Sequence, residues 1–220
     1  MRNLFEKIKH MIAGMVFPQP RRVAFLEQAS PHDIVAKAQP ANPSRYPTLT
    51  ACFSYKDPLI KEAVWEIKYH GNMQIVQLFA EILADQIRAE FDERTPVEAI
   101  TSPVVISPVP MPRKRLRERG WNQSDLLAKE TTKILDAPWA SYSPHLLKRT
   151  RSSPPQTELS REERLKNMEG AFETSEPTKL ANRIVILIDD VTTTGATYAA
   201  ARAALINSGA REVLGFTIAH

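Results

Sequence analysis

The chain has 220 residues, 43% of them hydrophobic, and a net charge of +4 at neutral pH. This length allows a substantial core, and one domain with an extension is the simplest arrangement. The mildly basic charge suits anionic ligands without identifying one. The single cysteine, Cys52, excludes an internal disulfide and a cysteine-rich zinc site. For the same reason we expect no zinc. No apolar stretch is long enough to span a membrane and no signal peptide is indicated, so we expect a cytoplasmic protein.

Residues 1–50 are expected to form an N-terminal extension that precedes a body of residues 51–220. Residues 1–17 place apolar side chains at helical spacing beside basic ones, which predicts an amphipathic helix. Such a helix can pack on the body, form a homodimer contact or touch a membrane surface, and packing is the simplest of these. The remainder of the extension is rich in proline, and one short helix is expected after Ser30, with Pro31 at its first position.

Two helices are predicted at the start of the body. Asp57 and Pro58 are typical of the beginning of a helix, and Gly71 is expected to end it. The second helix carries a stripe of apolar residues between Ile75 and Ile87 that should face the core. Trp65 and Lys68 lie close to the end of the first helix and can lie near a binding site, but we interpret them as part of a partly packed surface.

A buried strand is predicted from Val104 to Pro110, and a strongly basic segment follows it. Five cations and one acid occur between Arg113 and Arg119. Arginine side chains and backbone amides can bind an anion there, which makes this segment a candidate binding site. The alternatives are a solvated basic helix face, above all for Lys114 and Arg117, and the binding of nucleic-acid phosphates.

The next elements are a helix and a long polar excursion. Asn122 or Ser124 can cap the helix, which should end before Pro138. Within residues 148–172, Ser160 and Glu163 form a capping-box pattern that predicts a short helix at residues 161–168. A long charged excursion inside a compact domain favours a lid over a binding site, and the alternative is a surface helix hairpin.

The most informative stretch begins with an apolar run from Ile184 to Ile188, which predicts a strand buried on both faces of a parallel sheet. Two adjacent carboxylates, Asp189 and Asp190, follow at the edge where open α/β sheets bind ligands. A loop then leads into a helix that Gly209 should terminate. Backbone amides at such a helix N-terminus bind anions. The loop consists of small and hydroxyl residues, namely Thr192, Thr193, Thr194, Gly195, Ala196 and Thr197.

Carboxylates beside a phosphate-binding loop suit a sugar phosphate, because the acids can accept hydrogen bonds from ring hydroxyls or hold a divalent cation. This stretch resembles the 5-phosphoribosyl-1-pyrophosphate (PRPP) signature of the type I phosphoribosyltransferases. Together with other motifs, it resembles the ComF family over residues 53–220. The other motifs are Tyr55 and Pro58, then Lys68, Tyr69 and Gly71, then Pro108 to Pro110, then Arg115 to Gln123, and finally Gln156 to Asn167.

The resemblance implies an α/β fold of the type I phosphoribosyltransferase kind, with a mostly parallel sheet flanked by helices. It implies PRPP and Mg²⁺ as ligands, catalytic roles for Asp189 and Asp190, which can also hold the Mg²⁺, and 5′-phosphate contacts from Thr192 to Thr197. Pyrophosphate contacts are implied for Pro110, Met111, Pro112, Arg113, Arg115 and Arg119, and a lid for Gln156, Arg161, Arg164 and Asn167.

The ComF family is named for competence, the uptake of DNA in natural transformation. Its members often carry an N-terminal zinc finger with paired cysteines soon after a Phe-Pro pair, whereas no cysteine follows Phe17 and Pro18 here. The leading hypothesis is a Mg²⁺-dependent phosphoribosyltransferase with an unidentified acceptor. The second is a non-catalytic protein that senses PRPP or a related nucleotide, or that binds single-stranded DNA. The third is a scaffold that contacts competence proteins.

Overall fold

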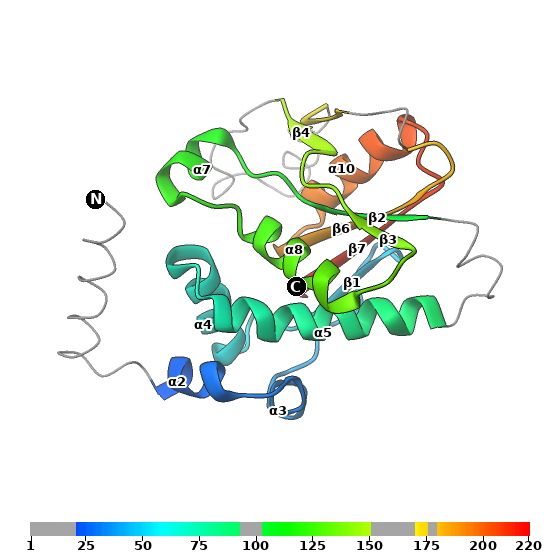
Figure 1. Cartoon of the computed structure of the whole chain (residues 1–220). Helices are drawn as coiled ribbons and strands as arrows, with labels where there is room; N and C mark the ends of the chain where they lie inside the picture. Colours follow the sequence, from blue (N-terminus) through cyan, green and yellow to red (C-terminus); the bar gives the residue numbers. More distant parts are fainter. Residues whose placement is uncertain (1–20, 93–102, 151–169, 176–179) are drawn as a thin grey trace.

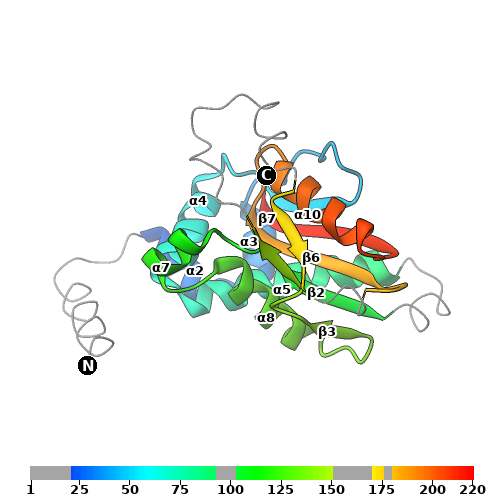
Figure 2. The same cartoon turned by 90° about the horizontal axis from the view of Figure 1, so that it is seen from above.

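The computed structural model describes residues 21–92, 103–150, 170–175 and 180–220. The helices expected at residues 1–17 and 161–168 lie outside these ranges. A five-stranded parallel sheet forms the centre, in the order β1–β7–β6–β2–β3. Figure 2 shows β7, β6, β2 and β3 as successive arrows. The strands are β1 (Leu49–Phe53), β2 (Val104–Pro108), β3 (Ala140–Tyr142), β6 (Ile184–Val191) and β7 (Glu212–Ala219).

Helices cover both faces of this sheet (Figure 1). One face packs against α4 (Pro58–Trp65), α5 (Met73–Asp92) and α8 (Gln123–Leu135). The other packs against α10 (Ala196–Asn207) and an antiparallel hairpin of β4 (Leu147–Arg149) and β5 (Phe172–Thr174). The predicted α/β class of the type I phosphoribosyltransferase kind is therefore confirmed.

Strand β6 explains why the sheet needs cover on both sides. Ile184, Ile186 and Ile188 belong to the core beneath α5 and α8, while Val185 and Leu187 belong to the core beneath α10. Successive side chains of a strand point to opposite faces, so an unbroken apolar run suits a strand that is buried on both faces of the sheet. The predicted strand is confirmed, and it extends through both carboxylates to Val191.

The helix boundaries follow the local signals. Asp57 caps α4 through hydrogen bonds from the Leu59 and Ile60 amides, and Pro58 is its first residue. The chain continues into a π-helical turn, η1 (Glu66–His70), which Gly71 ends with a φ of 59°. Asn122 caps α8 through the Ser124 amide, and the basic segment forms a short helix, α7 (Arg113–Arg119).

The described part of the extension contains two helices, α2 (Arg21–Gln28) and α3 (Pro31–Lys37), which lie against α4 and α5 (Figure 1). Ser30 and Asp33 form a capping box at the start of α3, where a helix was predicted, whereas α2 was not predicted. Leu26 and Ile34 are fully buried in the core that the sheet shares with α5. In the described ranges, no helix has the length and apolar character needed to cross a membrane.

Candidate functional site

A cavity of about 640 Å³ lies where β2 and β6 end. The two strands are hydrogen-bonded neighbours, and the Val109 amide still donates to the Ile188 carbonyl at 2.9 Å just beyond β2. This places the turn after β2 beside the carboxylates of β6, at the sheet edge where α/β proteins bind ligands. Four cationic side chains and three carboxylates line the cavity, namely Lys68, Arg115, Arg119, Arg149, Glu118, Asp189 and Asp190.

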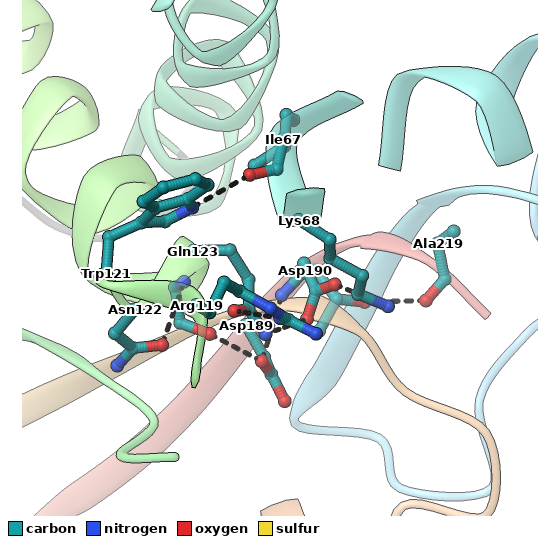
Figure 3. A network of polar contacts seen from close by, with 11 residues as sticks. Ile67, Lys68, Arg119, Trp121, Asn122, Gln123, Asp189, Asp190 and Ala219 are labelled. Carbon is teal, nitrogen blue, oxygen red and sulfur yellow. Dashed lines mark hydrogen bonds and ion pairs between the residues drawn. The ribbon is translucent and has the colours of Figure 1, made fainter. Parts of the chain in front are cut away.

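Asp190 is held by side chains from two elements (Figure 3). Its Oδ2 atom is 2.8 Å from Lys68 Nζ, and its Oδ1 atom accepts a hydrogen bond from Gln123 Nε2 at 3.3 Å. Arg119 donates in turn to Gln123 Oε1 at 2.8 Å. Asp190 is only 3% exposed, so these contacts compensate for the loss of water around its charge.

Asp189 is more accessible and has weaker compensation. Its Oδ1 atom accepts from Ser124 Oγ at 2.7 Å and from the Asp190 amide at 3.0 Å. Burial, together with the charge of Asp190, raises the pKa of Asp189 to about 8. The two adjacent acids therefore differ: Asp190 forms an ion pair with Lys68, whereas the hydrogen bonds to Asp189 come from neutral donors.

Lys68 belongs to the site, and interpreting it as part of a partly packed surface was wrong. Burial lowers the pKa of Lys68, but the charge and hydrogen bond of Asp190 raise it further, so the net shift is upward. The turn that carries Lys68 is fixed by Trp121, whose Nε1 donates to the Ile67 carbonyl at 3.1 Å (Figure 3). The Trp121 ring also lies against Gly71, where an added Cβ would be 3.2 Å away.

The arginines of α7 separate into two groups. Arg115 and Arg119 line the cavity with the turn residues Pro110, Met111 and Pro112, whereas Arg113 does not. The Arg119 guanidinium lies over the Tyr69 ring at 5.0 Å. Arg113, Lys114 and Arg117 are exposed. A short helix explains this division, because only one of its faces can meet the cavity.

Arg149 is a cavity residue that sequence reasoning missed. It ends β4 and lies at the start of the excursion predicted at residues 148–172. Burial and the charge of Arg115 lower the pKa of Arg149, and Asp189 counteracts them. Its place at the start of this polar excursion was the signal available. The predicted lid residues Gln156, Arg161, Arg164 and Asn167 lie outside the described residues.

The loop after β6 is shared between two cavities. Thr197 lines the large cavity with the two aspartates, while Thr193, Thr194 and Gly195 line a neighbouring one of about 310 Å³. Thr192 and Ala196 are buried. The extension supplies the other wall of the smaller cavity through Arg45 and Tyr46, which sequence reasoning did not connect with the loop.

Gly195 has two reasons to be a glycine. Its φ is 72°, a conformation that side chains disfavour, and it immediately precedes α10. In addition, a Cβ at this position would come within 2.4 Å of the Tyr46 ring. The loop thus keeps its backbone at the N-terminus of α10, where amides suit an anion.

The donors of the cavity suit a divalent cation only in part. Asp189 and Asp190 supply hard carboxylate oxygens, but Lys68 and Gln123 already engage Asp190. Within the described ranges, no three His, Cys, Asp or Glu side chains gather into a metal site. A Mg²⁺ ion here would therefore use Asp189 first and take most of its ligands from a bound molecule and water.

Several known proteins are similar to this chain. DNA utilization protein YhgH of Escherichia coli (strain K12) is 29% identical over 171 residues, which cover 78% of this chain and 71% of that protein. Competence protein F of Haemophilus influenzae is 30% identical over 160 residues, covering 72% of this chain and 66% of that protein. Competence protein ComFC of Bacillus subtilis is 32% identical over 167 residues, which cover 76% of this chain and 61% of that protein.

No protein-family model matches the chain. The names of these relatives nevertheless agree with the family that the motifs suggested, and the parallel sheet agrees with the expected fold. The chain therefore belongs to the ComF family.

Proposed function

We propose that the chain binds PRPP with Mg²⁺ and transfers its phosphoribosyl group to an acceptor, releasing pyrophosphate. The observation that carries this proposal is the pair of carboxylates at the end of β6, facing a cavity with four cationic side chains. A sugar phosphate with a diphosphate needs both kinds of group, because its hydroxyls donate hydrogen bonds and its phosphates are anions.

Each part of the cavity has a role in this reaction. Asp189 and Asp190 accept hydrogen bonds from the ribose hydroxyls, and the charge of Asp190 stabilises the cationic ring that develops as the bond to pyrophosphate breaks. Lys68 and Gln123 orient Asp190 for this task. Thr197 and the amides at the start of α10 hold the 5′-phosphate. Mg²⁺, when bound, neutralises charge on the leaving pyrophosphate.

The leaving group also needs cations from the protein. Arg115 and Arg119 lie in the cavity beside the turn Pro110 to Pro112, and their guanidinium groups can bind pyrophosphate oxygens. No covalent intermediate with the protein is required, since placement and electrostatic stabilisation lower the barrier.

The names of the relatives favour a role in DNA handling or competence. One surface supports a second candidate function, the binding of single-stranded DNA. Arg113, Lys114 and Arg117 are exposed on α7. Exposed aromatic rings, Trp65 and Tyr69, lie on the neighbouring turn, and Arg119 contacts Tyr69. Cations with aromatic rings suit single strands.

Calorimetric titration of PRPP with MgCl₂ tests the first proposal. The wild type should bind, and Asp189→Asn with Asp190→Asn should weaken binding by about tenfold or more, because amide groups replace two carboxyl acceptors for the ribose hydroxyls. Asp85→Asn is a matched control, since this exposed carboxylate on α5 pairs with Arg88 and lies outside the cavity.

Absence of heat with the wild type would contradict PRPP binding. Pyrophosphate release over a panel of nucleobases then separates an enzyme from a sensor that binds without turnover. Salt-sensitive binding of single-stranded DNA that survives both aspartate substitutions would favour the second candidate.

A further inference from the structure

The smaller cavity, of about 310 Å³, lies between the loop that precedes α10 and the N-terminal extension. The loop contributes Thr193, Thr194 and Gly195 to its walls, and the extension contributes a short segment around Arg45 and Tyr46. Among the described residues that line it, none is acidic, whereas three carboxylates line the larger cavity. On these walls an anion therefore meets no carboxylate, while the hydroxyls of ribose find acceptors in the larger cavity.

Packing and hydrogen bonds fix the segment that carries Arg45. The Tyr46 ring makes an edge contact with the ring of Tyr198, at 5.8 Å between centroids, and Tyr198 is buried in the first turn of α10. Further along the segment, the Thr48 carbonyl accepts hydrogen bonds from the Tyr198 hydroxyl at 2.9 Å and from the Gly215 amide of β7 at 2.8 Å. The segment is therefore anchored to both α10 and the sheet, which gives it a defined position beside the loop.

Arg45 keeps its positive charge available to a ligand. Its guanidinium lies over the Tyr46 ring, 4.6 Å from the centroid, and donates to the Tyr46 hydroxyl at 2.5 Å. Both contacts are to one neutral side chain, and no carboxylate of the described ranges forms an ion pair with Arg45. A guanidinium has several N–H donors, so others remain for a ligand. Stacking on a ring orients the guanidinium without neutralising it, which suits the binding of an anion.

Hydroxyl groups add further donors to the smaller cavity. The Ser44 hydroxyl accepts a hydrogen bond from the Tyr46 amide at 3.1 Å, and the Thr194 hydroxyl accepts one from the Ala196 amide at 3.4 Å. Because each oxygen acts as an acceptor towards the backbone, its own O–H group is available to donate into the cavity. One cation, several hydroxyl donors and no acid on the described walls are the groups that a phosphate monoester needs.

We propose that Arg45 binds the 5′-phosphate of the sugar phosphate, so that the N-terminal extension completes the binding site. This inference rests on the proposed function, in which the ribose lies at the two aspartates and the loop before α10 holds the phosphate. The loop borders both cavities, since Thr197 lines the larger one while Thr193 and Thr194 line the smaller. A sugar phosphate that crosses this loop keeps its ring at the carboxylates and presents its 5′-phosphate to Arg45.

The test compares three ligands, each titrated with MgCl₂ into the full chain: PRPP, ribose 5-phosphate and inorganic pyrophosphate, which has no 5′-phosphate. Arg45→Met should weaken binding of PRPP and of ribose 5-phosphate by about tenfold and leave binding of pyrophosphate unchanged, because it removes a charged donor from one end of the ligand only. Arg45→Lys, which keeps the charge without the planar fork, should fall between the wild type and Arg45→Met. Arg22→Met is the matched control, since this exposed arginine of α2 lines neither cavity, and it should match the wild type.

Equal affinity of the wild type and Arg45→Met for ribose 5-phosphate would overturn the assignment of Arg45. An equal loss for all three ligands would also overturn it, because Arg45 would then attract anions in general or its replacement would disturb the site. If the wild type bound ribose 5-phosphate through Arg45 but did not bind PRPP, the proposed function would fail and the assignment would stand. If the wild type and Arg45→Met bound PRPP equally well, the assignment would fail and the proposed function would stand.

Discussion

Asp189 and Asp190 are adjacent in the chain but have different surroundings. Because strand side chains alternate, Asp190 continues the face of Ile188 and meets Lys68 and Gln123, whereas Asp189 opens onto the cavity. Burial and the neighbouring charge of Asp190 both disfavour the ionised form of Asp189. The site therefore carries an electrostatic cost, which is typical of functional sites.

The pKa of Asp189 predicts how stability depends on pH. It is raised above its ordinary value to about 8 in the folded protein, so the folded state holds this proton more tightly than the unfolded chain does. The contribution of Asp189 to stability is thus greatest in acid and is lost as the pH rises through about 4 to 8. Asp189→Asn should be more stable than the wild type at about pH 9 and similar to it at about pH 4.

Urea unfolding of both proteins at the two pH values measures this difference. Asp85→Asn controls for the loss of an exposed carboxylate. If Asp189→Asn loses as much stability as the wild type at alkaline pH, Asp189 is not the group that causes the pH dependence of stability.

At the scale of elements, the connection from β6 into α10 combines backbone conformation with long-range packing. Gly195 and Gly209 both have positive φ, at 72° and 97°, before and after α10. Their surroundings differ, because the Tyr46 ring fills the space beside Gly195 while nothing lies within 4 Å of a Cβ at Gly209. Substituting each glycine therefore distinguishes the free-energy cost of the backbone conformation from the cost of steric overlap with a neighbouring side chain.

Gly209→Ala should destabilise the protein by about 1 kcal/mol, the ordinary cost of a side chain in this conformation. Gly195→Ala should cost about 1–3 kcal/mol more, because it adds a steric overlap with Tyr46. Chemical denaturation of both variants, alone and with Tyr46→Ala, measures the difference. Equal losses for the two glycine variants, or no relief of Gly195→Ala by Tyr46→Ala, would contradict this account.

At the scale of the whole molecule, the described part of the extension shares the core of the sheet. Leu26 of α2 and Ile34 of α3 are buried with α4 and α5 residues. Asp57 links the two parts further, because its Oδ2 accepts a hydrogen bond from the Gln39 amide at 2.9 Å while its Oδ1 caps α4. Tyr46 then brings the extension to the loop that precedes α10.

Adjacent residues of α3 test this integration. Ile34 is fully buried and Val35 is 60% exposed. Ile34→Ala should destabilise the whole protein by about 2–4 kcal/mol, because it leaves a cavity in the shared core. Val35→Ala should change stability by less than about 0.5 kcal/mol.

We expect a single unfolding transition, measured both by circular dichroism and by tryptophan fluorescence. In Ile34→Ala both signals should shift together by the same amount. If the two probes separated, or if Ile34→Ala cost no more than Val35→Ala, the extension would not be part of the cooperative core.

Local signals were sufficient wherever a short stretch decides the conformation. The apolar run before Asp189 predicted a strand buried on both faces, Asp57 and Pro58 predicted where α4 begins, and Gly71 predicted where its continuation ends. Capping, glycine conformation and side-chain alternation act within a few residues, so they can be recognised without the fold. The same is true of the carboxylate pair as a candidate site.

Tertiary structure alone decided which distant residues join that pair. Lys68 of η1 and Arg149 of the hairpin line the cavity with the carboxylates, and Tyr46 of the extension lies against the neighbouring loop. These residues are far apart in the sequence, and only the packing of their elements brings them together. The division of the α7 arginines also depended on which face of a short helix meets the cavity. The amino-acid sequence by itself determined the class of fold and the acidic centre of the site, since both depend on short-range chemistry. The cations around that centre depend on strand order and packing, which only the folded chain provides.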